Sequence, residues 1–188
     1  KVAALEFNAV SDIRVKNIIN TRSINDDLEI IKQMKTYDYS YIDKRNDGYK
    51  EKIGFIAQEI KSINENFTNE SKRFIPDIYK RFNLKTKNRI ITLSKISLDK
   101  GDLIKVEVYY DNQYKIFEVN VLEISENEVY INLSNELDID LSKGIFIYGK
   151  YVDNFLTVDI NQITSVNTNI IKYLLEKVEN LENQIKNR

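Results

Sequence analysis

The sequence contains no cysteine and no histidine among its 188 residues. Disulfides, thiol nucleophiles, classical zinc sites and every catalytic triad that uses histidine are therefore excluded. It has one proline and five glycines, against roughly 9 and 13 at an average usage of about 5% and 7%. A chain so poor in both residues is neither a flexible linker nor a low-complexity tail.

Charge of neither sign dominates. The 28 Lys and Arg residues balance 29 Asp and Glu residues, for a net charge of −1, which argues against nucleic acid as a partner. No run of about 18 apolar residues and no signal-peptide pattern occurs, so we also expect no membrane partner. The chain begins with Lys1 rather than Met, and we expect it to be a fragment or processed piece of something longer.

The first third of the chain predicts alternating short elements. Residues 1–10 are expected to be an extended apolar segment that would need partners for its strand edges. Ser23 is placed to cap an amphipathic helix that runs to about residue 35. Alternating tyrosines predict a strand over 36–43, followed by a turn at Asn46-Asp47-Gly48. A partner strand and a short helix are then expected over 52–63.

The composition changes twice after that point. Between about 67 and 76 it turns polar, and Pro76 interrupts it. From about 85 to 149, β-rich runs recur at roughly ten-residue spacing, with hairpin loops at 111–113 and 125–127. This region predicts a small antiparallel barrel or sandwich, inserted as one unit.

A long helix is predicted from Asp159 to the end of the chain. Asp159 and Gln162 make an approximate capping box. Apolar residues then alternate at spacings of three and four, which is the seam of a coiled coil; they are Ile171, Leu174, Val178, Leu181 and Ile185. Continued backwards, the seam contains the polar Asn167 and Thr164. Self-association is therefore expected, although these residues do not fix the number of chains.

Few residues are candidates for chemistry. The glycines are isolated, so no phosphate-binding loop exists. Glu136, Asp138 and Asp140 are most simply a solvated loop, since the glycine and terminal glutamate of a calcium-binding hand are missing. We expect no metal and no cofactor.

Ser11 and Lys16 are the remaining candidate pair. A lysine can act as a base toward a serine hydroxyl when burial lowers its pKa from about 10.4 toward neutrality. On a continuous helix a spacing of five residues separates two side chains by about 140°. The pair therefore works only if Ser11 precedes the turn that carries Lys16. On spacing alone, the simpler reading is that Ser11 or Asp12 caps a turn and Lys16 is a surface cation.

The surrounding residues resemble a known family. Residues 11–18, SDIRVKNI, are similar to the S-D-x-R-x-K-x-x-I opening of the intramolecular chaperone domain of endosialidases and other viral tail spikes and fibres. Residues 53–60, IGFIAQEI, resemble its G-[FV]-I-A-Q-E-[VI] signature. Residues 152–159 and the terminal helix are similar to the self-cleaving domain of the myelin regulatory factor. Residues 85–149 resemble the β insertion of some large-virus members.

The resemblance implies a function. Such domains form homotrimers, assist the folding of an upstream fibrous stem of the same polypeptide, and then cut themselves off with a serine–lysine dyad. The resemblance implies that this dyad is Ser11 as nucleophile and Lys16 as general base. A serine hydroxyl reaches the preceding carbonyl through a five-membered ring, so we expect scission of the Val10–Ser11 bond rather than the bond after Ser11. The resemblance to viral proteins also implies that the chain folds in the host cytoplasm. The upstream stem, which is the folding client, would then enter the virion, and the chaperone piece would be released after cleavage.

The expected fold class is α+β: a small α/β chaperone core, an inserted antiparallel β module and a long C-terminal helix in a trimeric coiled coil. The expected divisions are client stem at 1–10, core at 11–84, β module at 85–149, and return to the core with the coiled-coil helix at 150–188. The module is equally well read as an arm that encloses client strands or as a decorating domain. Two other functions stay open: a trimerisation and folding cap that never cleaves, and a β module that binds a host receptor or glycan.

Overall fold

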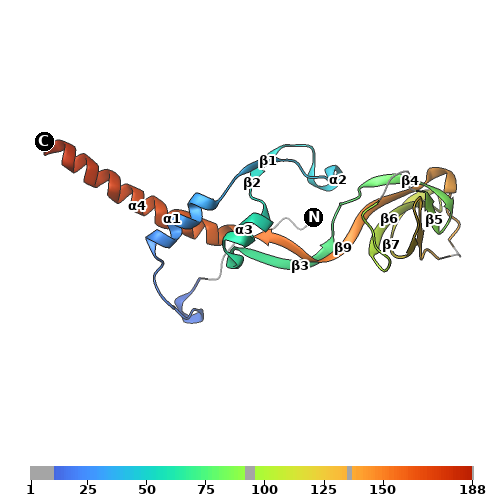
Figure 1. Ribbon diagram of the computed structural model, residues 1–188, viewed down its shortest axis with the longest axis horizontal. Helices are drawn as coiled ribbons and strands as arrows, with labels where there is room; N and C mark the ends of the chain where they lie inside the picture. Colours follow the sequence, from blue (N-terminus) through green and yellow to red (C-terminus); the bar gives the residue numbers. More distant parts are fainter. Residues whose placement is uncertain (1–10, 92–95, 135–136, 188) are drawn as a thin grey trace. The chain divides into compact units, whose positions relative to one another are not determined.

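The computed structural model of the chain describes residues 11–91, 96–134 and 137–187 (Figure 1). These residues divide into two compact units. The first combines the described residues up to Gln33 with those from Asn161 onward, and the second is Met34–Ile160. Within the described residues, no helix is both long enough and apolar enough to cross a membrane.

The first unit contains three helical elements. A single 3-10 turn, η1, spans Ile13–Val15, the helix α1 spans Ile24–Gln33, and the helix α4 spans Ile160–Lys186. The Asp26 backbone N–H donates to Ser23 Oγ at 3.4 Å, so Ser23 caps α1 as predicted. The long C-terminal helix is confirmed, and it begins directly after Asp159.

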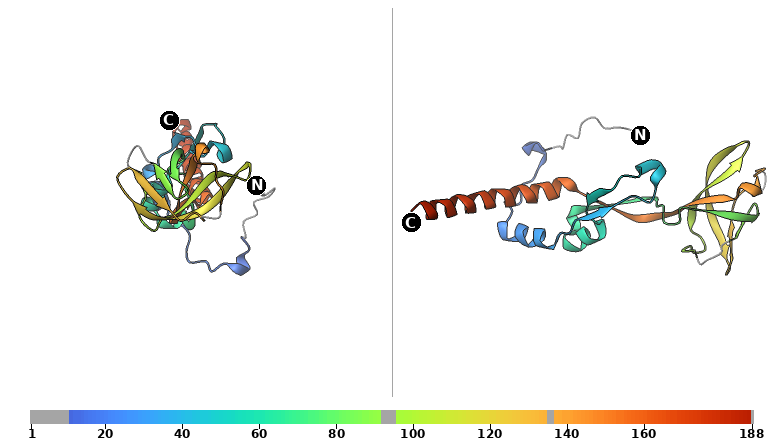
Figure 2. Two further views of the ribbon diagram at one scale, coloured as in Figure 1. Left: turned by 90° about the vertical axis from the view of Figure 1, so that its right-hand side faces the viewer. Right: turned by 90° about the horizontal axis from the view of Figure 1, so that it is seen from above.

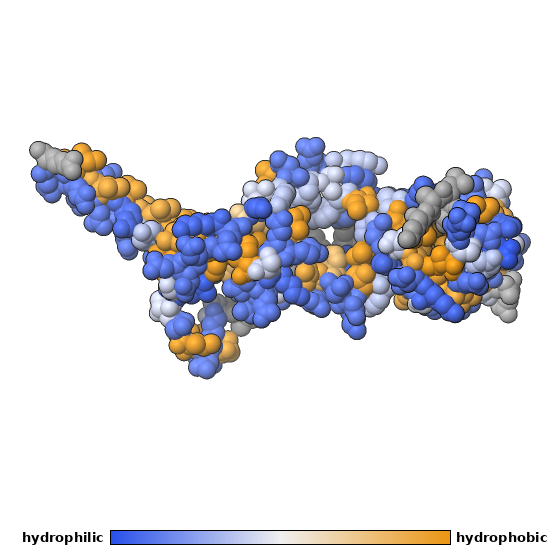
Figure 3. Space-filling model, viewed as in Figure 1, coloured by the Kyte–Doolittle hydropathy of each residue, from blue (hydrophilic) through white to orange (hydrophobic). Residues whose placement is uncertain are grey.

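The helix α4 has two apolar faces of different kinds. Ile163, Val166 and Ile170 are buried near its start. Beyond them, the predicted seam residues are exposed in the single chain, by between 52% for Leu174 and 73% for Ile185. Figure 3 shows hydrophobic side chains following the outer part of this helix. The chain therefore leaves a long apolar stripe of α4 in contact with water.

The second unit begins with a hairpin and a short helix. Strand β1 (Tyr37–Tyr39) pairs antiparallel with β2 (Lys52–Gly54), and helix α3 spans Ala57–Ile63, as predicted. The prediction of a strand as far as residue 43 and a simple turn at 46–48 is wrong. A short helix, α2, spans Lys44–Asp47 instead, because the Asp43 carboxylate accepts a hydrogen bond from Asn46 N and caps it.

A two-stranded ribbon follows α3 and the 3-10 turn η2 (Glu65–Phe67). Strand β3 (Thr68–Phe74) pairs antiparallel with the second half of β9 (Ile145–Val158). Strand β3 was not predicted, because most of its side chains are exposed on both faces and show no alternation. The polar stretch between about 67 and 76 thus contains a solvated strand.

An antiparallel barrel makes up the rest of the second unit. It contains β4 (Lys80–Thr86), β5 (Arg89–Ile91), β6 (Leu103–Tyr110), β7 (Gln113–Ile124), β8 (Glu128–Ile131) and the first half of β9; a last 3-10 turn, η3, spans Leu141–Lys143. The order β9-β4-β5-β8-β7-β6 closes because β6 also pairs with β9. In the left view of Figure 2 the barrel faces the viewer.

The barrel interior is filled by branched aliphatic side chains. Along β6, the buried Ile104, Val106 and Val108 alternate with residues that face outward. The β6–β7 turn has positive φ at Asp111 (52°) and Asn112 (58°), the conformation of a tight hairpin that suits these two residue types. The predicted fold is thus confirmed as mixed α and β, with antiparallel sheets and a long C-terminal helix.

Candidate functional site

Ser11 and Lys16 lie together. Lys16 Nζ donates a hydrogen bond to Ser11 Oγ at 2.8 Å. The distance is within the range that a base needs to take a proton from a hydroxyl. Ser11 precedes the 3-10 turn η1 and Lys16 terminates it, which is the arrangement that the spacing of five residues requires.

The turn between the two residues is held by its own side chains. Asp12 Oδ1 accepts a hydrogen bond from Arg14 N at 2.8 Å, so Asp12 is the N-cap of η1. The Arg14 guanidinium also donates to both carboxylate oxygens of Asp12. These bonds from the side chain and then the backbone of Arg14 lower the pKa of Asp12 from its usual value. The motif residues Asp12 and Arg14 thus form the loop that brings Lys16 back to Ser11.

The segment around Ser11 and Lys16 is exposed to water and rich in apolar side chains. Both Ser11 and Lys16 are exposed. Four aliphatic side chains beside them are exposed as well: Ile13, Val15, Ile18 and Ile19, the last by 90%. Val10 and the predicted scissile bond to Ser11 lie outside the described residues, as does the segment 1–10 expected to be the client stem.

In this state the hydrogen bond runs from the lysine to the serine. A lysine that donates through its ammonium form has no lone pair with which to accept the serine proton. General-base action requires the reverse direction, in which a neutral amine accepts the serine proton. The described chain therefore brings the Ser11 hydroxyl and the Lys16 amine within hydrogen-bond distance, with both side chains exposed.

The second motif has a structural use. Glu59 accepts a hydrogen bond from the Tyr37 hydroxyl at 2.8 Å, which joins α3 to β1. This bond raises the pKa of Tyr37 above its usual value. A Cβ on Gly54 would lie 3.1 Å from the Tyr39 ring, so glycine allows the hairpin strands to pack closely. Gly54 and Glu59 support the hairpin and α3.

A buried polar cluster was missed by the sequence reasoning. Asp27 is fully buried, and its carboxylate accepts hydrogen bonds from Arg22 Nε and Asn169 Nδ2, each at 2.7 Å. Asp27 was expected only as an acidic residue in the first turn of α1. No local pattern signals a partner on α4, since Asn169 lies 142 positions away.

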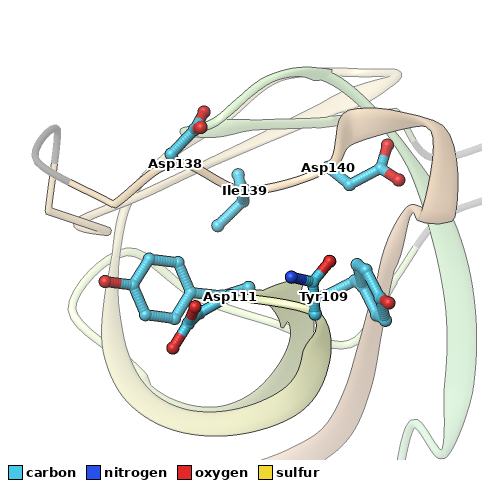
Figure 4. A pocket seen from close by; sticks show the side chains of 7 residues that line it. Tyr109, Asp111, Asp138, Ile139 and Asp140 are labelled. Atoms are coloured by element: carbon cyan, nitrogen blue, oxygen red, sulfur yellow. The ribbon is translucent and has the colours of Figure 1, made fainter.

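The acidic loop of the barrel borders a cavity of about 490 Å³ at the β6–β7 turn (Figure 4). Asp138, Asp140 and Asp111 line it. Among the described residues, no cluster of three or more acidic side chains is arranged so that it could hold a metal ion. Asp140 caps η3 through Ser142, whose side chain and backbone donate to it and lower its pKa. The third predicted member, Glu136, lies outside the described residues.

A second buried carboxylate, Asp43, is surrounded by donors. It accepts from Asn46 Nδ2 at 2.6 Å and from the Tyr79 hydroxyl at 3.1 Å. Burial alone would raise the pKa of Asp43, but these hydrogen bonds outweigh it and the pKa is lowered. Burial, followed by the charge of Asp43, raises the pKa of the neighbouring Tyr148 to about 12. This network holds α2 on the second unit and contains no candidate nucleophile.

Residues 11–70 match the family model of peptidase S74, described as chaperone of endosialidase. The matched residues include Ser11 and Lys16 and the two motifs at 11–18 and 53–60, whereas the resemblances at 85–149 and from 152 onward lie outside the match. The family identified from those motifs is thereby confirmed for this segment. No curated protein matches the chain.

Proposed function

Since residues 11–70 belong to the chaperone-of-endosialidase family, we propose that the chain is a trimerising intramolecular chaperone that cleaves itself at Ser11. The family's two names describe a chaperone and a peptidase. The observation that carries the peptidase part is the 2.8 Å contact between Lys16 Nζ and Ser11 Oγ. Ser11 is the nucleophile and Lys16 the general base.

The reaction is an acyl shift followed by hydrolysis. Ser11 Oγ attacks the carbonyl carbon of Val10 through a five-membered ring, and its proton passes to the neutral Lys16 amine. Lys16 returns that proton to the Ser11 nitrogen as the Val10–Ser11 peptide bond breaks, which leaves an ester between Val10 and Ser11 Oγ. Water then cleaves the ester to a Val10 carboxylate and a new chain that begins with Ser11.

Association through α4 supports the chaperone part. The seam residues are more than half exposed in the single chain, and apolar residues at spacings of three and four pack against identical helices. A coiled coil raises the effective concentration of the attached chains and sets their register. An intertwined stem depends on non-local contacts, and its strand edges are unpaired until the strands align. Holding the chains together in register therefore assists the folding of such a stem most.

Association would also switch on the dyad. Ile13, Val15, Ile18 and Ile19 are exposed around Ser11 and Lys16. Covering these side chains in a trimer would remove water from Lys16 and favour its neutral form. Cleavage then follows correct assembly, and loss of the chaperone leaves the stem kinetically trapped in its folded form.

Intact mass spectrometry of the chain and its Ser11→Ala variant tests the proposal. We expect a fragment that begins with Ser11 from the parent alone, with trimers of both in sedimentation. Uncleaved trimers of the parent would instead favour a permanent folding cap, and cleavage in the Ser11→Ala variant would exclude Ser11 as the nucleophile.

A further inference from the structure

The carboxylate of Asp27 has no contact with water, although it lies in the first turn of a helix of only ten residues. A buried charge is costly unless it is paired and hydrogen-bonded. Arg22 Nε donates to Oδ1 and Asn169 Nδ2 donates to Oδ2, each at 2.7 Å. Both oxygens are therefore satisfied, by groups from two different segments.

These partners connect the dyad segment to α4. Arg22 lies between Lys16 and the start of α1, while Asn169 lies on α4 next to the buried Ile170. Purely apolar packing between α1 and α4 would tolerate sliding. A buried amide–carboxylate pair permits one register, because any other position leaves polar groups without partners.

The cluster leaves the apolar seam free. At 100° per residue, Asn169 is separated from the seam residues by about 120° to 180° around the helix axis. Asn169 thus faces away from the exposed side chains of Ile171, Leu174 and Val178. One face of α4 can associate with other chains while the opposite face holds α1.

We infer that the Arg22–Asp27–Asn169 cluster is the anchor through which association of α4 acts on Ser11 and Lys16. This role rests on the proposed function. All three are positioning residues, since the described contacts of the cluster do not reach the dyad atoms. A ten-residue helix is marginal by itself, so the persistence of α1 depends on this anchor.

A swap of the two polar groups across the helices provides the test. Asn169→Asp places two carboxylates against each other, whereas the double variant Asp27→Asn/Asn169→Asp restores a carboxylate–amide pair. Asn180→Asp makes the same chemical change at an exposed position of α4 and is the control. All variants are made with and without Ser11→Ala, and sedimentation checks that they associate.

Hydrogen–deuterium exchange of the α1 amides in the uncleavable set tests the anchor independently of cleavage. We expect Asn169→Asp to raise the exchange rate at least tenfold and the double variant to return most of the protection. An unchanged exchange rate in Asn169→Asp would overturn the anchor. Equal loss of protection in the double variant would do the same, because it would show that the pairing is irrelevant.

The cleavage rate in the set that retains Ser11 tests control of the dyad. We expect Asn169→Asp to slow cleavage at least tenfold while trimers persist, with recovery in the double variant and no change in Asn180→Asp. A parent that cleaves, with Asn169→Asp cleaving equally fast, would overturn this inference and leave the proposed function intact. A parent that never cleaves would contradict the proposed function and, with it, the inference that the cluster controls cleavage. The exchange rates of the α1 amides would still test whether the cluster anchors α1 to α4.

Discussion

The hydroxyl of Tyr37 donates a hydrogen bond to the carboxylate of Glu59 at 2.8 Å, and this bond ties the β1–β2 hairpin to α3. The change Tyr37→Phe removes the donor and leaves Glu59 without that partner. We expect a small decrease in melting temperature and no effect on cleavage, because Tyr37 belongs to the second unit and Ser11 to the first. Thermal unfolding with a parallel mass measurement checks both; a loss of cleavage in a fully folded variant would contradict it.

Gly149 is the glycine whose replacement should cost most. Its φ is 155°, and an added Cβ would overlap the carbonyl oxygen of Ile75 and lie 2.9 Å from Asp77 N. The change Gly149→Ala should lower the free energy of unfolding by about 3 kcal/mol, since backbone must move and strain is added. Gly101 is the control, because its φ is 96° but the space around it is open. In urea unfolding, Gly101→Ala should lower the free energy of unfolding by about 1 kcal/mol. Equal decreases for Gly149→Ala and Gly101→Ala would contradict this prediction.

Tyr148 makes stability sensitive to alkaline pH. Its pKa is raised to about 12 by burial and then by the charge of Asp43, so the folded state binds this proton more tightly than the unfolded state. The contribution of this proton to the free energy of unfolding is complete below about pH 10. That contribution is lost as the pH rises through 12. The change Tyr148→Phe should therefore reduce the fall in melting temperature between pH 9 and pH 11.5. An unchanged alkaline profile in Tyr148→Phe would show that other tyrosines set it.

The seam of α4 should control association and little else. Leu181 is 56% exposed in the single chain, so Leu181→Glu should change the stability of a monomer by less than about 0.5 kcal/mol. Within a coiled coil it would place a charge in the packed seam. Sedimentation equilibrium should give a single chain for Leu181→Glu and a trimer for Asn180→Glu, which adds the same charge at the neighbouring exposed position. A trimer of both would rule out this seam as the interface.

The apolar side chains beside the dyad should matter only in the assembly. Ile19 is 90% exposed, so Ile19→Ser has almost nothing to remove in the single chain. If Ile19 is covered on association, its loss should slow cleavage about tenfold or more, from the apolar burial given up. Asn20→Ser is the matched control. Equal cleavage rates for the two variants would mean that Ile19 stays uncovered.

The sequence predicted the elements that have strong local signals. Ser23 capping, the α3 helix after Gly54 and the alternation along β6 all follow from the identity of a few neighbouring residues. The pair of Ser11 and Lys16 was found from its motif, and Asp12 was already a candidate to cap the turn between them. These features are local, so a single sequence contains them.

Other features depend on contacts between distant residues. Strand β3 is exposed on both faces. It is defined by its pairing with β9, in which Thr68 lies opposite Val158. The α2 helix exists because the carboxylate of Asp43 is buried among donors such as Tyr79. Asp27 and Asn169 meet only after α1 and α4 form. Neither periodicity nor turn propensity reports such pairs, which is why the sequence did not reveal them.

The central claim is that Lys16 removes the proton of Ser11, and Lys16→Arg tests it most directly. Arginine keeps the positive charge and can donate to Ser11 Oγ as the lysine does now, but it stays protonated and cannot act as a base. The mass of the product is followed over time for the parent and Lys16→Arg, with trimers of both verified. The account predicts a fragment beginning with Ser11 from the parent and an uncleaved chain from Lys16→Arg. Cleavage of Lys16→Arg at the rate of the parent would contradict it.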